Sequence, residues 1–118
     1  MESLQQALII EDDEDLAIIF TEALRLAGFD TKTIRDGQVA MDELDVCQPI
    51  VIVLDLHLPH VSGLEILAKI RADDRLKNTK VIIATADPRM SDLAEDADFV
   101  LIKPISFAQL RDLSARLR

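Results

Sequence analysis

Short apolar runs alternate with longer segments of helical periodicity along this chain. Four runs, at residues 7–10, 50–54, 81–84 and 99–102, are too short for a typical helix and predict strands. The run at 50–54 is continuously apolar and β-branched, which is typical of a strand buried on both faces. A weaker Thr-Lys-Thr-Ile pattern at residues 31–34 predicts one further, edge-like strand.

The segments between these runs predict helices. After the first strand, helical spacing recurs at Leu16, Ile19, Phe20, Ala23, Leu24 and Ala27. Gly28 ends that helix. A second helix is indicated by Val39, Ala40 and Leu44, with Val46 and Cys47 as its extension, after a turn at Asp36-Gly37.

Two further helices follow, one from about residue 63 to 71 and one capped by Ser106. The last helix has its apolar positions at Phe107, Leu110, Leu113 and Leu117. Residues 90–96 leave room only for a short helix. Five strands alternating with helices predict a parallel sheet with right-handed crossovers, because helical connections join parallel strands. The expected fold class is therefore a three-layer, doubly wound α/β sandwich in one domain, residues 1–118.

Composition narrows the classes of partner. The chain has four Phe, no Trp and no Tyr, so the core must be aliphatic. A net charge of −9 argues against nucleic acid or an anionic membrane as a direct partner. Cys47 is the one cysteine, which excludes an internal disulfide. No apolar run reaches about 18 residues and the N-terminus lacks a basic region, so we expect no membrane span, no signal peptide and a cytoplasmic location.

Side chains that can bind a metal ion or take part in a reaction lie where the predicted strands end. Glu11 and Asp12 follow the first strand, Asp55 ends the third, Thr85 the fourth and Lys103 the fifth. Parallel strands bring their carboxyl ends to one edge of the sheet, which is where open α/β sheets place their sites. We therefore expect three acids, one hydroxyl and one amine to meet there.

Each of these residues also has a simpler interpretation. Residues 11–15 are five consecutive acids, and Asp13, Glu14 and Asp15 are equally well explained as helix-capping charges. Thr85 alone would be an ordinary strand-end hydroxyl, and Lys103 a surface lysine. The histidines, His57 and His60, are better explained as loop residues than as metal ligands, since no other His or Cys lies at ligand spacing.

Taken together, the five residues suit a site for phosphoryl chemistry. Clustered carboxylates repel one another, and a hard divalent cation removes that conflict. Asp12 and Asp55 suit direct ligation of Mg²⁺, with Mn²⁺ as the alternative ion, and Glu11 suits ligation through water. One oxygen of Asp55 then remains as a nucleophile, while Lys103 and Thr85 offer a charge and a hydrogen bond to the phosphoryl group.

The sequence resembles the receiver domain of two-component response regulators over nearly its whole length. The resemblance rests on residues 8–13 (Leu-Ile-Ile-Glu-Asp-Asp), 53–59 (Val-Leu-Asp-Leu-His-Leu-Pro) with Gly63, 83–86 (Ile-Ala-Thr-Ala) and 103–104 (Lys-Pro). It implies strand order 2-1-3-4-5 and a signalling module rather than an enzyme.

The resemblance also implies roles for single residues. Asp55 accepts a phosphoryl group from a histidine kinase or a histidine phosphotransfer protein. Mg²⁺ is bound by Asp12, Asp55 and the backbone carbonyl of His57, with Glu11 in support. Thr85 is the switch hydroxyl and Lys103 the amine that pairs with the phosphate.

The chain departs from the receiver pattern in three places. Val100 stands where receivers often carry an aromatic residue, and Phe99 should face the other side of the strand. The segment from Thr85 to Lys103 is about one helical turn shorter than usual, which predicts a shortened or irregular fourth helix. Asp96-Ala97 replaces the usual Gly-Ala pair. All three departures fall on the face that receivers commonly use for output.

Two other functions compete with a phosphoacceptor module. A Mg²⁺-dependent phosphohydrolase with an Asp nucleophile would carry a second Asp two residues later, and His57 stands there instead. A receiver-like scaffold without phosphorylation would not need Glu11, Asp12, Asp55, Thr85 and Lys103 all to be present. Within the phosphoacceptor interpretation, His57 and Asp87 each lie two residues past a site residue and are expected to tune the lifetime of the phosphoryl group.

Overall fold

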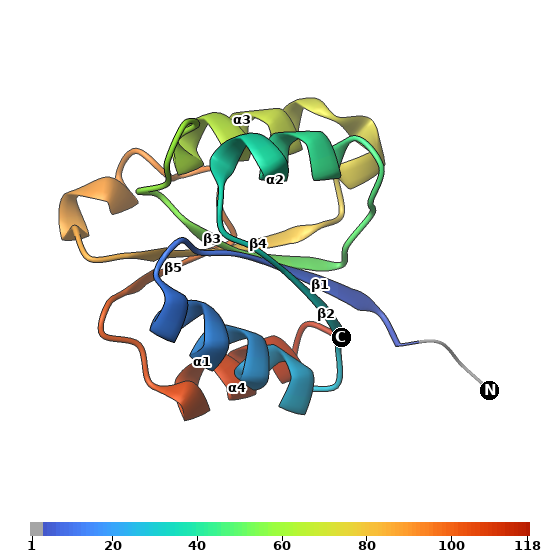
Figure 1. Cartoon of the computed structure of the whole chain (residues 1–118), viewed down its shortest axis with the longest axis vertical. Helices are drawn as coiled ribbons and strands as arrows, with labels where there is room; N and C mark the ends of the chain where they lie inside the picture. Colours follow the sequence, from blue (N-terminus) through green and yellow to red (C-terminus); the bar gives the residue numbers. More distant parts are fainter. Residues whose placement is uncertain (1–3) are drawn as a thin grey trace.

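Five parallel strands form one sheet in the order β2-β1-β3-β4-β5, as expected (Figure 1). The computed structural model describes residues 4–118. The first three residues, on which the absence of a signal peptide partly rests, lie outside this range. The elements are β1 (Gln6–Ile10), α1 (Glu14–Leu26), β2 (Asp30–Ile34), α2 (Gly37–Leu44), β3 (Val51–Asp55), α3 (Gly63–Ala72), the 3₁₀ turn η1 (Asp74–Leu76), β4 (Lys80–Thr85), the 3₁₀ turn η2 (Pro88–Ser91), β5 (Phe99–Ile102) and α4 (Phe107–Ala115).

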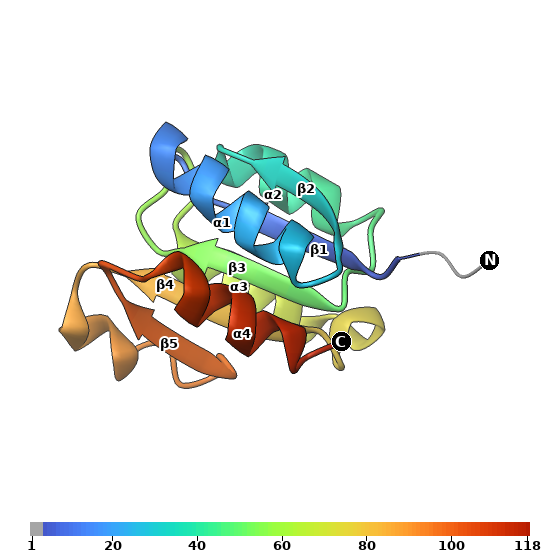
Figure 2. The same ribbon diagram turned by 90° about the horizontal axis from the view of Figure 1, so that it is seen from below.

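The helices cover both faces of the sheet. In Figures 1 and 2, α1 and α4 lie against one face and α2 and α3 against the other. The core under α2 and α3 is aliphatic, as expected, whereas the core under α1 and α4 also contains Phe20 and Phe29. The central strand β3 is buried along its whole length, which explains the apolar run that precedes Asp55. Within residues 4–118, no helix combines the length and the apolar character that a bilayer span requires.

Helix caps fix the starts of the helices as the sequence predicts. Asp13 accepts a hydrogen bond from the backbone N–H of Leu16, and Ser106 accepts one from Gln109. Gly28 adopts a φ of +103° directly after α1, which is strained for any residue with a Cβ. Asp36, expected in a turn, caps α2 instead, and its carboxylate accepts from the backbone N–H of residues 38 and 39.

The sequence prediction overextends the helices in places. The second helix ends at Leu44, so Val46 lies outside it and is 79% exposed. Leu117 likewise follows the end of α4, and Ile19 is 40% exposed rather than in the core. Helical spacing in the sequence does not show where a helix ends, because a terminal carbonyl can accept a hydrogen bond from a residue outside the helix. The carbonyl of Leu44, at the end of α2, has such a partner.

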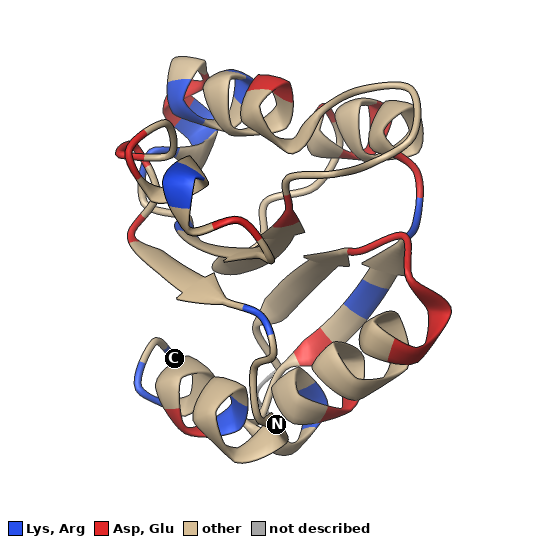
Figure 3. Ribbon diagram, turned by 90° about the vertical axis from the view of Figure 1, so that its left-hand side faces the viewer, with Lys and Arg blue, Asp and Glu red and all other residues tan. Residues whose placement is uncertain are grey.

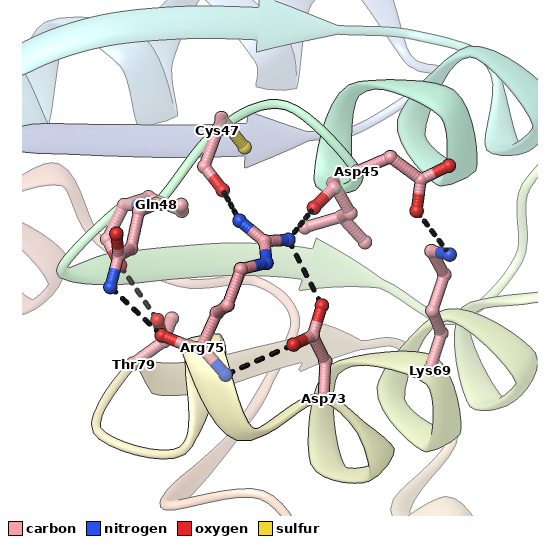
Figure 4. Close-up of polar contacts among 9 residues, drawn as sticks. Asp45, Cys47, Gln48, Lys69, Asp73, Arg75 and Thr79 are labelled. Carbon is pink, nitrogen blue, oxygen red and sulfur yellow. Dashed lines mark hydrogen bonds and ion pairs between the residues drawn. The ribbon is translucent and has the colours of Figure 1, made fainter.

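That partner is Arg75, at the amino-terminal edge of the sheet (Figure 4). Its guanidinium donates from Nη2 to the carbonyl of Leu44 at 2.6 Å and from Nη1 to the carbonyl of Cys47 at 3.2 Å. Asp73 pairs with the same guanidinium at 2.9 Å, and Gln48 donates to the backbone carbonyl of Arg75. One arginine from η1 thus ties the end of α2 to the end of α3.

The expected fourth helix is irregular, as predicted. Only the 3₁₀ turn η2 forms between β4 and β5, and it stands apart from the helical layers in Figure 1. Arg71 of α3 anchors the end of this segment, donating to the carbonyl of Asp96 at 2.9 Å and to Oδ2 of Asp98 at 2.8 Å. On β5, Val100 packs into the core under α2 and α3 while Phe99 packs into the other core, so the predicted opposition of the two side chains is confirmed.

Candidate functional site

Strand ends deliver the predicted residues to one edge of the sheet. Figure 3 views this edge, where acidic ribbon segments gather at the strand ends. Asp55 and Thr85 are the last residues of β3 and β4. The backbone N–H of Lys103, just after β5, donates to the carbonyl of Thr85 at 2.8 Å, so the parallel pairing continues one residue past the strand. The Lys103–Pro104 peptide bond is cis.

The three predicted metal-ligating carboxylates meet. Oxygen atoms of Glu11, Asp12 and Asp55 all lie within 4.8 Å of one another. Glu11 and Asp55 are buried, at 1% and 4% exposure, whereas Asp12 is exposed at the mouth. Backbone N–H groups fix the two buried side chains: Asp13 donates to Oε2 of Glu11 at 3.2 Å and His57 to Oδ1 of Asp55 at 3.1 Å. This is a cluster of carboxylate oxygens of the kind that hard divalent cations bind.

Lys103 supplies the compensating charge. Its Nζ lies 2.8 Å from Oε1 of Glu11 and 3.6 Å from Oδ1 of Asp55. The contact with Glu11 has the distance of an ion pair but not the angle of a hydrogen bond, so Oε1 has no hydrogen-bond partner among the described residues. A buried carboxylate oxygen in that condition favours a further positive ligand.

Burial dominates the electrostatics of Asp55. Desolvation, and next the neighbouring carboxyl group of Glu11, raise the pKa of Asp55 to about 7, against the opposing effects of the His57 N–H and of Lys103. Burial acts to lower the pKa of Lys103, but Glu11 and Asp55 outweigh it and the pKa is raised. The lysine therefore remains charged at neutral pH.

Glycine permits the loop that follows Asp55 to fold back beneath it. A Cβ on Gly63 would lie 2.4 Å from the carbonyl oxygen of Asp55, so only glycine fits. On the other side of the loop, a Cβ on Gly37 would lie 2.2 Å from the carbonyl oxygen of Val61. The loop that holds His57 is therefore packed tightly between α2 and α3.

Thr85 and Asp87 are joined directly. Thr85 is fully buried, and its hydroxyl oxygen accepts from the backbone N–H of Asp87 at 3.2 Å. The Asp87 carboxylate caps η2 and pairs with the exposed Arg89, whose hydrogen bonds hold the pKa of Asp87 below its usual range. The His57 side chain is exposed. The two expected rate-tuning residues therefore have different environments. Within residues 4–118, the His57 side chain forms no hydrogen bond or ion pair, whereas Asp87 is paired with Arg89.

Sequence reasoning missed one residue at this edge, Arg35. It follows β2, and its Nε and Nη2 donate to the backbone carbonyl of Asp12 at 3.3 and 2.8 Å. Its place at the end of a strand parallel to β1 was the available signal. That signal was overlooked because an arginine next to a turn is ordinarily a surface residue.

The family model that describes the response regulator receiver domain matches residues 7–115. The chain belongs to the receiver domain family. Receiver domains are the phosphoacceptor modules of two-component signalling and are not enzymes in their own right, and aspartate phosphorylation and Mg²⁺ binding are typical of them. They interact with histidine kinases.

Curated relatives of this receiver domain are transcriptional regulators. The chain is 36% identical to the transcriptional regulatory protein TrcR of Mycobacterium tuberculosis, over 96% of this chain and 44% of the relative. It is 33% identical to the transcriptional regulatory protein PrrA of Mycobacterium leprae, over 92% of this chain and 47% of the relative. The receiver domain thus spans less than half the length of these relatives.

Solved receiver structures share the fold. A CheY-like receiver domain from Methylobacillus flagellatus is 31% identical, with a TM-score of 0.85 over 98% of this chain and 100% of that one. The response regulator TrrA of Thermotoga maritima, solved in complex with Mg²⁺ and a beryllium fluoride, is 26% identical, with a TM-score of 0.86 over 98% and 100% of the two chains.

Proposed function

We propose that this receiver domain accepts a phosphoryl group on Asp55 from a phosphohistidine, carried by a histidine kinase or a histidine phosphotransfer protein. A carboxylate oxygen of Asp55 forms the new O–P bond as the N–P bond of the phosphohistidine breaks. The leaving nitrogen keeps the bonding electron pair, so the histidine leaves as the neutral imidazole when its other ring nitrogen carries a proton. The observation that carries this proposal is the contact of Lys103 with two buried carboxylates, Glu11 and Asp55.

The residues at this edge fit a divalent cation. Three carboxylates within reach of one ion, one of them with an oxygen that lacks a hydrogen bond, form the ligand set that Mg²⁺ or Mn²⁺ prefers. Asp12 and Asp55 would hold the ion, with the carbonyl of His57 and, through water, Glu11. When bound, the ion neutralises charge on the phosphoryl group in transfer.

The chain's own groups position the phosphoryl group and hold the product. The Asp55 side chain is already oriented by the N–H of His57. Lys103, which carries its charge at neutral pH, is placed to pair with a phosphoryl oxygen. The buried hydroxyl of Thr85 supplies a hydrogen bond to another oxygen and carries the change of state into the segment after β4.

His57 and Asp87 would set how long the phosphoryl group survives, because both lie at the rim where water approaches. The double variant His57→Ala, Asp87→Ala should change the rate of dephosphorylation. An unchanged rate would remove both residues from this role.

The output of this domain depends on what it is joined to. The curated relatives are transcriptional regulators, and the chain covers less than half of them. We infer that residues 1–118 form a receiver domain that acts in the cytoplasm, on an output domain in a longer protein or on a separate partner. The net charge of −9 makes the unit itself a poor ligand for nucleic acid or an anionic membrane.

Intact-mass spectrometry after incubation with acetyl phosphate tests this function, because a small phosphodonor removes the need for the unidentified kinase. With Mg²⁺ present, the chain should gain one phosphoryl group and lose it slowly. Without Mg²⁺ it should gain none. Uptake that is equal with and without Mg²⁺ would contradict the proposal.

A further inference from the structure

Arg35 contacts the metal-binding edge through the backbone, not through a carboxylate. Register sets this contact: Ile10 pairs with Ile34 between β1 and β2, and the N–H of Glu11 donates to the carbonyl of Ile34 at 3.0 Å. Arg35, which follows Ile34, therefore lies beside the residues that follow Ile10 at the end of β1. Its guanidinium spans the remaining gap and donates twice to the carbonyl of Asp12.

Asp12 has little else to hold it in place. The preceding residue is held by the β1–β2 ladder, and the following residue, Asp13, caps α1. Across residues 4–118, the carbonyl of Asp12 accepts hydrogen bonds from Arg35 alone, and the Asp12 carboxylate is exposed without a side-chain partner. The position of this carboxylate is thus determined by its backbone, and Arg35 is the side chain that fixes the backbone.

We propose that Arg35 is a positioning residue for the cation site: by binding the carbonyl of Asp12 it holds the Asp12 carboxylate in reach of Glu11 and Asp55. This inference rests on the proposed function, since it assumes that Asp12 ligates the ion. Groups that orient metal ligands commonly alter affinity by about 10-fold or more when they are removed.

Because Arg35 is charged, the direction in which Mg²⁺ affinity changes when it is replaced tests the inference. A guanidinium bound to the backbone of a metal ligand repels an incoming cation, so its charge alone would weaken Mg²⁺ binding. If Arg35 acted only by charge, its removal would tighten Mg²⁺ binding. If Arg35 positions Asp12, its removal weakens Mg²⁺ binding in spite of the relieved repulsion.

Two substitutions separate geometry from charge. Arg35→Lys keeps the charge but cannot donate twice to one carbonyl in the same planar geometry. Arg35→Met keeps the apolar stem and removes both the charge and the donors. Lys32→Met is the matched control, because Lys32 lies in β2, the strand that Arg35 follows, carries the same charge and pairs with Glu43 instead.

Calorimetric titration with Mg²⁺ alone, together with the free energy of unfolding without Mg²⁺, is the measurement. We expect Arg35→Lys and Arg35→Met each to weaken Mg²⁺ binding about fivefold to tenfold, with Lys32→Met within twofold of the wild type. The free energy of unfolding should change by similar amounts in Arg35→Met and Lys32→Met, which separates positioning from a general loss of stability.

Two outcomes of the Arg35 titrations would overturn the inference. Tighter binding in Arg35→Met with unchanged binding in Arg35→Lys would show that Arg35 acts as a charge. Unchanged binding in both would show that it does not act on the site. The variant Asp12→Asn tests the metal site on which the inference rests. If this variant binds Mg²⁺ as the wild type does, the proposed metal site is itself wrong. If Asp12→Asn weakens binding but Arg35→Lys does not, only the inference fails.

Discussion

The ammonium group of Lys103 lies 2.8 Å from Oε1 of Glu11, and the glutamate is almost completely buried. A buried carboxylate without its cation is costly, because the charge loses its partner and regains little solvation. We therefore expect Lys103 to stabilise the fold, in addition to its proposed role at the phosphoryl group. Replacing Lys103 should lower the free energy of unfolding most when no divalent cation is present.

We expect Lys103→Met to lower the free energy of unfolding by about 2–3 kcal/mol without Mg²⁺. Added Mg²⁺ should stabilise this variant more than it stabilises the wild type, since the ion replaces the missing charge. Denaturant unfolding with and without Mg²⁺ measures both effects. As a control, Lys32→Met breaks an exposed pair and should cost less than about 1 kcal/mol. A Lys103→Met cost no larger than that of the control would refute the prediction.

The raised pKa of Asp55 predicts how stability depends on pH. Between its usual range and about 7, the folded state holds a proton that the unfolded chain has released. Stability from this group is therefore present at low pH and is lost as the pH rises through about 7. Asp55→Asn cannot ionise. Without Mg²⁺, its free energy of unfolding should therefore rise relative to that of the wild type by about 2–3 kcal/mol between about pH 5 and about pH 8.

Denaturant titrations of the wild type and Asp55→Asn across that range check this prediction. With Mg²⁺ present the order should reverse at high pH, because the ion stabilises the ionised carboxylate. A difference that does not change with pH would mean that Asp55 ionises in its ordinary range.

Arg75 should matter for stability and not for the site. It binds the carbonyls of Leu44 and Cys47 at the edge of the sheet opposite the carboxylates (Figure 4). Arg75→Met should lower the free energy of unfolding by about 1–3 kcal/mol, since partly buried carbonyls lose charged donors. Its Mg²⁺ affinity should match the wild type. A weakened Mg²⁺ affinity would show that the two edges of the sheet are coupled.

The response to phosphorylation should be confined to the segment after β4. Val100 is β-branched and packed in the core, so it cannot supply the rotamer change of an aromatic residue. The segment is instead tied at one end to the hydroxyl of Thr85 through Asp87, and at the other to Arg71 through Asp96 and Asp98. A Thr85 hydroxyl that moves toward the phosphoryl group would shift Asp87, whose backbone N–H is hydrogen-bonded to it, and so order the turn.

Hydrogen exchange with and without beryllofluoride and Mg²⁺ tests this hypothesis. Protection should increase for residues 86–98 and remain unchanged in α4. In Arg71→Met, which releases the second tie, the change should extend into β5. If protection changes mainly in residues 106–117, the response uses the conventional output face and the hypothesis is wrong.

The sequence predicted what depends on periodicity and strand ends. Residues 50–54 could only be a buried strand, and a parallel sheet then places Asp55 beside Glu11 and Asp12. It could not predict Arg75 or Arg71, because each binds backbone carbonyls far away in sequence and leaves no residue pattern there. For the same reason it overextended the second helix to Val46 and missed Arg35, whose partner is a carbonyl and not a side chain.

Locating the phosphoryl group by chemical trapping tests the central claim most directly. Borohydride reduces an aspartyl phosphate to homoserine, which peptide mapping by mass spectrometry identifies at a single position. After incubation with acetyl phosphate and Mg²⁺, we predict homoserine at position 55 in the wild type and none in Asp55→Asn. Homoserine at position 12 or 13, or equal phosphoryl uptake by Asp55→Asn, would contradict the assignment of Asp55 as the phosphoacceptor.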